Sequence, residues 1–332
     1  MRVGIIMVSV GISGMGSYVP PKILTNDDMA KIVDTSDEWI YSRIGIKERR
    51  VVEGDVCTSD LAALASERAL EDAGIAAEDL DMIVLATSSP DVPLSSTAGV
   101  LQGKLGAVNA GAFDLGAVCT GYVYALDVGA KYAADPNYDH VLVVGAEVYS
   151  KILNWEDRTT CVFFGDGAGA AVVSECDEGR GILASYLKAD GRGAEVIEIP
   201  AGGTKRPISH EAIDEGLQYF HMDGRAVWDF AIVALPEAVK GALARCGKTV
   251  EEVDMVISHQ SNINIITTGM EALGLPMEKT YTNLKRYGNM AGASIPVALH
   301  EAVQEGKISP GDLVVLAGYG GGLAWGANAM IW

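Results

Sequence analysis

Cys119 is the residue of this 332-residue chain that is best placed to act as a nucleophile. It stands where a short apolar run ends and a helix-like pattern begins, which continues to Ala134 before Asp135-Pro136 stops it. A thiol in the first turn of a helix faces unpaired backbone N–H groups and the positive end of the helix dipole, and both favour the thiolate. A single cysteine among small residues is more often a buried apolar side chain, so Cys119 needs partners to be catalytic.

An internal repeat indicates which elements would position such partners. Asp81 precedes an apolar strand-like run that reappears after Asp254, and Asp139 precedes another that reappears after Asp312. The members of each pair are 173 residues apart, as their numbers show. Two separate segments that share one offset indicate a duplicated α/β unit.

The same offset aligns Cys119 with Gly292, which closely follows Asn289, and it places His259 at the C-terminal end of a strand. Ligand sites in α/β sheets gather at the C-terminal ends of strands and at the helix N-termini beyond them. We therefore expect two facing helices to bring Cys119, His259 and Asn289 within reach of one substrate. Taken alone, His259 fits a hydrogen-bonded core histidine, and Asn289 fits a turn residue after Gly288.

The rest of the chain alternates between predicted helices and strands. The apolar N-terminus is interrupted by glycines, so we predict a buried strand over about residues 7–15 rather than a signal peptide, with Met7 as an alternative start. Short helices are expected after Asn26 or Asp27 and after Thr35 or Ser36. Further helices are predicted over about 61–73, 94–106, 119–134 and 294–303, strands over 80–87, 140–145, 253–258 and 313–318, and a loop-rich stretch over 186–222. The glycine-rich run 165–169 lies between apolar strand residues, which favours close backbone packing over a phosphate loop.

Composition narrows the classes of protein that fit. Hydrophobic residues make up 49% of the chain and mean hydropathy is +0.20, as expected for a well-packed globular protein. A net charge of -19 argues against nucleic-acid binding. The five cysteines lack metal-ligand spacing, so we expect no metal site and reduced thiols in the cytoplasm. No apolar stretch reaches the ~20 residues of a membrane span, so a soluble protein is expected.

Short motifs in the C-terminal third resemble the beta-ketoacyl-acyl carrier protein synthase III family of the thiolase superfamily. They are His259-Gln260-Ser261-Asn262, Tyr287-Gly288-Asn289 and Gly320-Gly321-Gly322-Leu323-Ala324-Trp325-Gly326. Supporting motifs are Asp34-Thr35-Ser36-Asp37-Glu38-Trp39-Ile40, Gly45-Ile46-Lys47-Glu48-Arg49, Arg158 before Phe164-Gly165-Asp166-Gly167-Ala168-Gly169, and Met222-Asp223-Gly224-Arg225. They occur in the family's order from about residue 10 to the end, and as a set they are highly specific.

The resemblance implies an α/β, thiolase-like, five-layered αβαβα fold built from two duplicated halves. We expect residues 1–180 to form the half that carries the nucleophile and residues 181–332 the half that carries His259 and Asn289. It also implies a homodimer and an acyltransferase that uses no cofactor beyond coenzyme A thioesters as substrates.

The family's chemistry assigns a role to each residue of the expected triad. Cys119 would take an acyl group from coenzyme A, and His259 and Asn289 would donate hydrogen bonds to the enolate left when a malonyl thioester loses CO2. Backbone N–H groups of Cys119 and Gly321 would form the oxyanion hole. The expected product is a 3-oxoacyl-acyl carrier protein that starts a fatty acid or polyketide chain.

Other residues match the family's substrate-binding positions. Expected coenzyme A contacts are Thr35, Trp39, Arg43, Arg158, Gly224 and Asn262, with Trp39 and Arg158 stacking on the adenine. Ile44 replaces a common Thr, which removes one polar contact. Leu94 stands where a Phe from the dimer partner often lines the acyl pocket, and a smaller side chain there would admit acyl groups larger than acetyl.

The positions that usually dock the acidic acyl carrier protein are atypical. Where relatives place Arg or Lys, this chain has Asp229, Asn264, Glu271 and Ala272. Lys240 or Lys285-Arg286 would have to compensate for this loss of positive charge. The alternatives are therefore an acyltransferase with a coenzyme A thioester or small metabolite as acceptor, or a silent partner subunit. The retained triad argues against the silent subunit.

Overall fold

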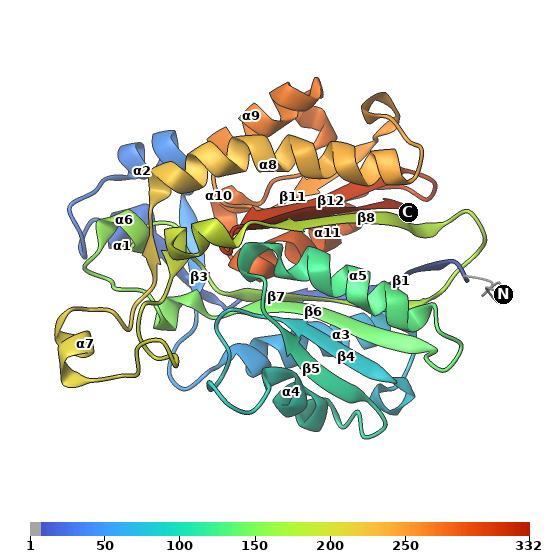
Figure 1. Ribbon diagram of the computed structural model, residues 1–332, viewed down its shortest axis with the longest axis horizontal. Coiled ribbons are helices and arrows are strands. Elements are labelled where there is room, and N and C mark those ends of the chain that lie inside the picture. Colours follow the sequence, from blue (N-terminus) through green and yellow to red (C-terminus); the bar gives the residue numbers. More distant parts are fainter. Residues whose placement is uncertain (1–7) are drawn as a thin grey trace.

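Two β-sheets form the centre of the protein in the computed structural model, which describes residues 8–332 (Figure 1). The first sheet has the order β1-β7-β6-β4-β5 and the second has the order β11-β12-β13-β8. The strands of the first are β1 (Val10–Tyr18), β4 (Met82–Ala86), β5 (Gly111–Leu115), β6 (His140–Glu147) and β7 (Gly167–Glu175). Those of the second are β8 (Gly181–Ala189), β11 (Met255–Ser258), β12 (Leu313–Gly320) and β13 (Ala324–Ile331).

Helices complete five layers around and between these sheets (Figure 1). The central pair, α5 (Gly121–Ala133) and α11 (Ser294–Gln304), contacts both sheets. One outer layer is α3 (Thr58–Ala73) with α4 (Thr97–Leu105), and the other is α8 (Gly224–Arg245) with α9 (Ile263–Leu273). This arrangement confirms the αβαβα fold predicted from the resemblance.

The two halves repeat one another closely around the central helices. β4 runs parallel to β6, and β11 runs parallel to β12. A 3₁₀ turn precedes each central helix, Val118–Thr120 before α5 and Ala291–Ala293 before α11, and these turns keep the offset found in the sequence. Beside β11, an isolated parallel bridge between Val256 and Thr280 takes the position that β5 has beside β4.

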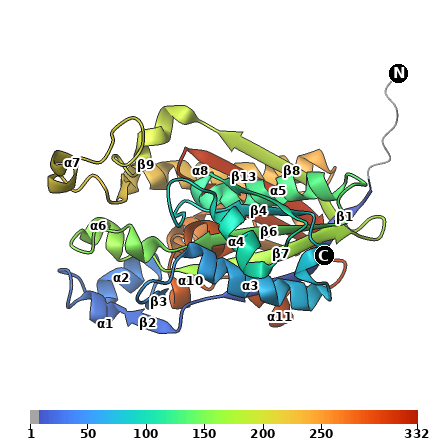
Figure 2. The ribbon, with the colours of Figure 1, turned by 90° about the horizontal axis from the view of Figure 1, so that it is seen from below.

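Smaller elements gather at one end of the molecule, opposite the C-terminus (Figures 1 and 2). They are β2 (Lys22–Thr25), α1 (Asn26–Met29), α2 (Asp37–Ile44), β3 (Glu48–Val51), α6 (Arg158–Cys161), β9 (Ile197–Glu198), α7 (His210–Asp214), β10 (His221–Met222) and α10 (Leu284–Tyr287). The buried Arg49 joins several of them, because its guanidinium donates to Asn26 Oδ1 and to the Val162 carbonyl at 3.0 and 2.7 Å.

Several element boundaries differ from the sequence predictions. β1 begins at Val10, later than predicted, and Met7 lies outside the described residues. Thr25 caps α1 instead of Asn26 or Asp27, because its hydroxyl accepts the Asp28 N–H. α4 starts at Thr97 rather than Leu94, since Ser96 provides its cap. Within residues 8–332, no helix combines the length and apolar character needed to cross a membrane.

Candidate functional site

Cys119 lies in the turn between β5 and α5 and is buried in the interior of the protein. The chain reverses through Val118, whose φ of 45° lies in the left-handed region that few β-branched residues adopt. Thr120 fixes the turn to the second half, because its hydroxyl donates to the Ala324 carbonyl at 2.9 Å. The Cys119 side chain is 6% exposed. The turn therefore presents a single thiol at the junction of the two halves.

His259 follows the C-terminal end of β11, as the repeat predicted. Its backbone N–H donates to the Ala317 carbonyl at 2.8 Å, which extends the pairing of β11 with β12 by one residue. The imidazole is 1% exposed, and its Nδ1 lies 2.7 Å from Ser294 Oγ. The Tyr319 ring meets it edge-on, with ring centroids 5.3 Å apart. The ring orientation is thus fixed on two sides.

Asn289 is held in a bend after α10. Gly288 has a φ of 66°, and a Cβ there would lie 2.7 Å from the Phe163 carbonyl, so this close approach requires glycine. The Asn289 backbone N–H donates to that same carbonyl at 2.9 Å. Its Oδ1 accepts the Ala291 N–H at 2.8 Å, which leaves the Nδ2 hydrogens free to donate elsewhere.

One cavity of about 90 Å³ is lined by Cys119, His259 and Asn289. The structure therefore brings together the three residues that the sequence placed at one site. Apolar and aromatic side chains make up most of the remaining wall, namely Phe163, Phe164, Ile197, Phe220, Met222, Val227, Trp228, Ile265 and Tyr319. Such a wall excludes water and strengthens any hydrogen bond made inside.

Burial keeps both the thiol and the imidazole uncharged near neutral pH. It raises the pKa of Cys119 to about 12, helped by the negative charge of nearby Glu147. It also lowers the pKa of His259 to about 3. The position of Cys119 at a helix start suggested a thiolate, but desolvation outweighs the helix end here. The resting site thus holds a neutral thiol beside a neutral imidazole.

Backbone N–H groups of Cys119 and Gly321 face the sulfur, and both act to lower the pKa of the thiol. The neighbouring Gly320 approaches so closely that a Cβ at its position would lie 2.6 Å from Cys119 Cβ. The expected oxyanion-hole residues therefore converge on the Cys119 sulfur, and this close packing requires a glycine at position 320.

The residues expected to bind coenzyme A form a path leading outward from the cavity. Gly224 and Asn262 line the cavity itself. Asn262 Nδ2 donates to the Arg43 carbonyl at 3.2 Å, which joins the cavity wall to the last turn of α2. On the same helix, Trp39 is 39% exposed, and the Arg158 guanidinium lies 5.4 Å from the centre of its ring.

Two further expected residues, Leu94 and Thr35, differ from these. Leu94 does not line the cavity of its own chain, and its side chain is 92% exposed. Thr35, just before α2, has a buried Oγ1 without a hydrogen-bond partner among the described residues. A buried hydroxyl without a partner is uncommon in folded proteins, and this one stands just before the helix that carries Trp39.

Comparisons with known proteins decide the family. Residues 113–191, which include Cys119, match the family model described as 3-oxoacyl-[acyl-carrier-protein] synthase III. Residues 243–332, which include His259 and Asn289, match the model of its C-terminal part. A beta-ketoacyl-[acyl-carrier-protein] synthase III of Caldanaerobacter subterraneus is 49% identical over 325 residues, 98% of each sequence. The chain belongs to the 3-oxoacyl-[acyl-carrier-protein] synthase III family.

Solved structures of synthase III proteins share the fold. One from Thermus thermophilus is 42% identical with a TM-score of 0.90, and the match covers 97% of this chain and 99% of that one. The priming beta-ketosynthase of the R1128 polyketide pathway is 30% identical with a TM-score of 0.91, covering 100% and 98%. As a synthase III family member, the chain is a condensing enzyme of the acyltransferase type.

The sequence did not single out several residues that shape this synthase III site. Ser294 contacts the histidine, and Tyr149 and Phe220 form an aromatic cluster with Phe164 of the family motif, with ring centroids 4.7–5.5 Å apart. Glu147 is fully buried, and its carboxylate accepts hydrogen bonds from Ser88, Ser89 and the Gly292 N–H. The repeat aligns Ser294 with Gly121, at the start of the other central helix. In the sequence, this alignment was the signal that could have placed Ser294 near the site.

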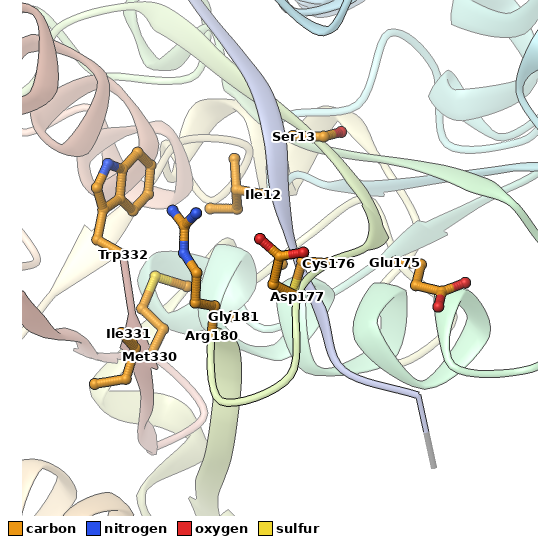
Figure 3. Close-up of a pocket in the computed structure, with 11 residues that line it drawn as sticks. Ile12, Ser13, Glu175, Cys176, Asp177, Arg180, Gly181, Met330, Ile331 and Trp332 are labelled. Atoms are coloured by element: carbon orange, nitrogen blue, oxygen red, sulfur yellow. The ribbon is translucent and has the colours of Figure 1, made fainter. Parts of the chain in front are cut away.

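A second hollow, of about 300 Å³, lies near the C-terminus between the ends of β1, β8 and β13 (Figure 3). Arg180, Trp332 and Cys176 are among the residues that line it, and the Arg180 guanidinium points between Ile12 and Trp332. None of the expected catalytic or coenzyme A residues lines it. The three expected catalytic residues line the smaller cavity of about 90 Å³ instead.

Proposed function

We propose that this synthase III loads an acyl group from coenzyme A onto Cys119 and condenses it with malonyl-acyl carrier protein. In the first half-reaction the sulfur attacks the thioester carbonyl. The N–H groups of Cys119 and Gly321 hold the resulting oxyanion, and coenzyme A leaves with the proton that the thiol gives up. Because burial holds the pKa of Cys119 near 12, this proton leaves during the attack and not before it.

In the second half-reaction the malonyl thioester loses CO2. The electron pair of the broken C–C bond forms an enolate, whose oxygen is held by His259 and Asn289 as donors. The enolate carbon then attacks the acyl-Cys119 carbonyl, the C–S bond breaks, and a 3-oxoacyl thioester is released. The Cys119 thiolate that leaves takes up one proton from solvent, which replaces the proton that left with coenzyme A, so the cycle closes without a metal or a redox cofactor.

The observation that supports this proposal best is the orientation of Asn289. Its Oδ1 accepts the Ala291 N–H, so the group that it offers to the shared cavity is a donor, as the enolate requires. Intact-mass spectrometry after incubation with a panel of acyl-coenzyme A esters tests the first half-reaction. Addition of malonyl-carrier protein or malonyl-coenzyme A then tests the second and identifies the acceptor.

Trp39 and Arg158 are proposed to clamp the adenine of coenzyme A. The Arg158 guanidinium lies 5.4 Å from the centre of the Trp39 ring, so two planar groups suited to stacking on a base stand side by side. A planar base would slide between them and keep both stacking contacts. Thr35, Arg43, Gly224 and Asn262 would line the route from this clamp to the sulfur.

A homodimer built on the edge of the first sheet is also proposed. β5 is the last strand of that sheet, and its far edge has no paired strand among residues 8–332. Val108 and Leu94 near this edge are 72% and 92% exposed. An unpaired edge with exposed apolar neighbours favours pairing with a second copy, which would carry Leu94 toward the partner's acyl pocket.

The carrier protein would dock on an unusual surface. Asp229 and Asn264 carry no positive charge. Asp229 is paired with Arg225 at 2.9 Å, which partly neutralises that cation, and Asn264 Nδ2 donates to the Arg43 carbonyl. Arg286 is paired with Glu301 at 2.9 Å. Lys285 and Lys240 are exposed and make no ion pair among the described residues, so they remain the cations available to an acidic partner.

A second function, condensation with an acceptor that is not bound to a carrier protein, is favoured by the same observation. The four atypical docking positions supply no cation, whereas the catalytic cavity is complete. In that case malonyl-coenzyme A or another thioester would discharge acyl-Cys119 as fast as malonyl-carrier protein. The mass-spectrometry experiment above distinguishes the two acceptors directly.

Two further proposals concern the chain as a whole. We place it in the cytoplasm, supported by the five free cysteines. We also retain residues 1–180 and 181–332 as its two halves. Support comes from the sheets, since the strands of the first sheet end at Glu175 and those of the second begin at Gly181.

A further inference from the structure

Ser294 has a hydroxyl that can decide which ring nitrogen of His259 carries the proton. Its Oγ lies 2.7 Å from His259 Nδ1 and 2.9 Å from the Ala291 carbonyl oxygen. The Gln260 N–H donates to the same Oγ at 3.3 Å. A hydroxyl has a single proton, so it can donate to the imidazole or to the carbonyl, but not to both.

The two choices give opposite tautomers of the neutral imidazole. If Ser294 donates to the carbonyl, Nδ1 must carry the proton, and Nε2 offers only a lone pair to the cavity. If Ser294 donates to Nδ1, the proton sits on Nε2 and can be donated into the cavity. Only the second arrangement lets His259 donate a hydrogen bond to a substrate oxygen.

Local geometry favours donation to His259. The Ala291 carbonyl already accepts the backbone N–H of Ser294, so it is not left unpaired when the hydroxyl turns away. The contact with Nδ1 is also the shorter of the two. Ser294 is fully buried at the start of α11, where water cannot replace its hydroxyl.

We propose that Ser294 is a positioning residue for condensation: its hydroxyl donates to His259 Nδ1 and so holds the imidazole proton on Nε2, facing the cavity. The assignment rests on the proposed role of His259 as a donor to the enolate oxygen. It adds that the donor state is set by the protein before the malonyl thioester arrives.

Nitrogen NMR of the full chain with ¹⁵N-labelled histidine reads the tautomer without measuring activity. The chain has five histidines, and loss of one signal set in His259→Gln assigns the residue. In the unmodified chain we expect His259 to have an unprotonated, hydrogen-bonded Nδ1 and a proton on Nε2. In Ser294→Ala we expect this preference for the Nε2 tautomer to be lost. A proton on Nδ1 in the unmodified chain overturns the proposal.

Single-turnover kinetics give an independent readout. In Ser294→Ala, discharge of acyl-Cys119 by malonyl thioester should slow about 10- to 100-fold, short of the ~10⁴-fold seen when a wrong tautomer is locked in place. Acylation by acetyl-coenzyme A should be nearly unchanged. Equal slowing of both steps, or of neither, contradicts the proposal.

Ser66→Ala is the matched control, because Ser66 is also fully buried and its Oγ has no partner among the described residues. It should leave both half-reactions and the His259 signals unchanged. Failure of the proposed function would look different, since the unmodified chain itself would then not be acylated at Cys119.

Discussion

Gly320 and Cys119 are packed so tightly that a Cβ at position 320 would lie 2.6 Å from Cys119 Cβ and 3.1 Å from its sulfur. The repeat pairs Gly320 with Glu147 and Cys119 with Gly292, and there the roles are exchanged. A Cβ on Gly292 would lie 3.0 Å from Glu147 Oε1. One half therefore carries the sulfur and leaves room for it, while the other fills the equivalent space with a carboxylate.

Replacing Gly320 by Ala should displace the nucleophile. The added methyl group must move Cys119 or the N–H donor at Gly321, and loss of one oxyanion donor costs ~10²–10³-fold. We expect a fall of that size in the rate of acylation by acetyl-coenzyme A, measured by quenched-flow mass spectrometry. Gly103→Ala in α4 has open space around the new Cβ and serves as the control. Normal acylation by Gly320→Ala would contradict the predicted crowding.

Asn289→Asp should separate the two half-reactions. One carboxylate oxygen can still accept the Ala291 N–H, but the other cannot donate to an enolate and would repel it. Condensation should therefore fall by ~10²–10³-fold, with a much smaller effect on acylation. Stopped-flow assays of each half-reaction check this, with the exposed Asn137→Asp as control. An unimpaired condensation rate would remove Asn289 from the mechanism.

Alkylation of Cys119 should depend steeply on pH. Because its pKa is raised to about 12, the thiolate fraction should grow about tenfold per pH unit between pH 6 and 9. Peptide mass spectrometry of iodoacetamide-treated protein can follow Cys119 separately from the other four cysteines. A rate that levels off below pH 8 would show a thiolate–imidazolium pair instead.

Glu147 should make the protein less stable as the pH rises toward 7. Burial raises its pKa from 4.5 to about 7, so between these values the folded state keeps a proton that the unfolded state releases. Stability attributable to this group is full below pH 4.5 and is lost as the pH passes 7, by roughly 3 kcal/mol. The difference between the Tm of Glu147→Gln and the Tm of the parent should become more positive as the pH rises from 4.5 to 7.5. A difference in Tm that does not change with pH would refute this charge state.

Glu271→Arg should improve use of a carrier-protein substrate if docking is the weak step. It adds positive charge on the exposed face of α9 without touching Arg43, whereas Asn264→Arg would also break the contact with the Arg43 carbonyl. The KM for malonyl-carrier protein should fall at low salt and return toward the parent value at high salt. The KM for malonyl-coenzyme A should stay constant. Glu78→Arg makes the same change in net charge at another exposed position and serves as the control.

Sequence periodicity and the internal repeat predicted the duplicated α/β unit and the meeting of Cys119 with His259 and Asn289. They did so because strand ends and helix starts place side chains by backbone geometry alone. The resemblance supplied Gly321 and the path from Asn262 to Trp39. The repeat further explains why Val118 and Ala291, 173 residues apart, share a positive φ of 45° and 42°.

What the sequence could not predict depends on burial and side-chain contacts. The thiol state of Cys119 follows from desolvation, which outweighs the helix start that suggested a thiolate. The roles of Ser294 and Glu147 depend on hydrogen bonds between segments 35 and 145 residues apart. No local pattern encodes such pairings, so these residues emerged only from the folded structure.

The most direct measurement is the mass of the chain before and after incubation with acetyl-coenzyme A, followed by peptide mapping. We expect the gain of one acetyl group, located on Cys119, absent in Cys119→Ala and removed when malonyl-carrier protein or malonyl-coenzyme A is added. An acetyl group on any other residue, or equal labelling of Cys119→Ala, would contradict this expectation.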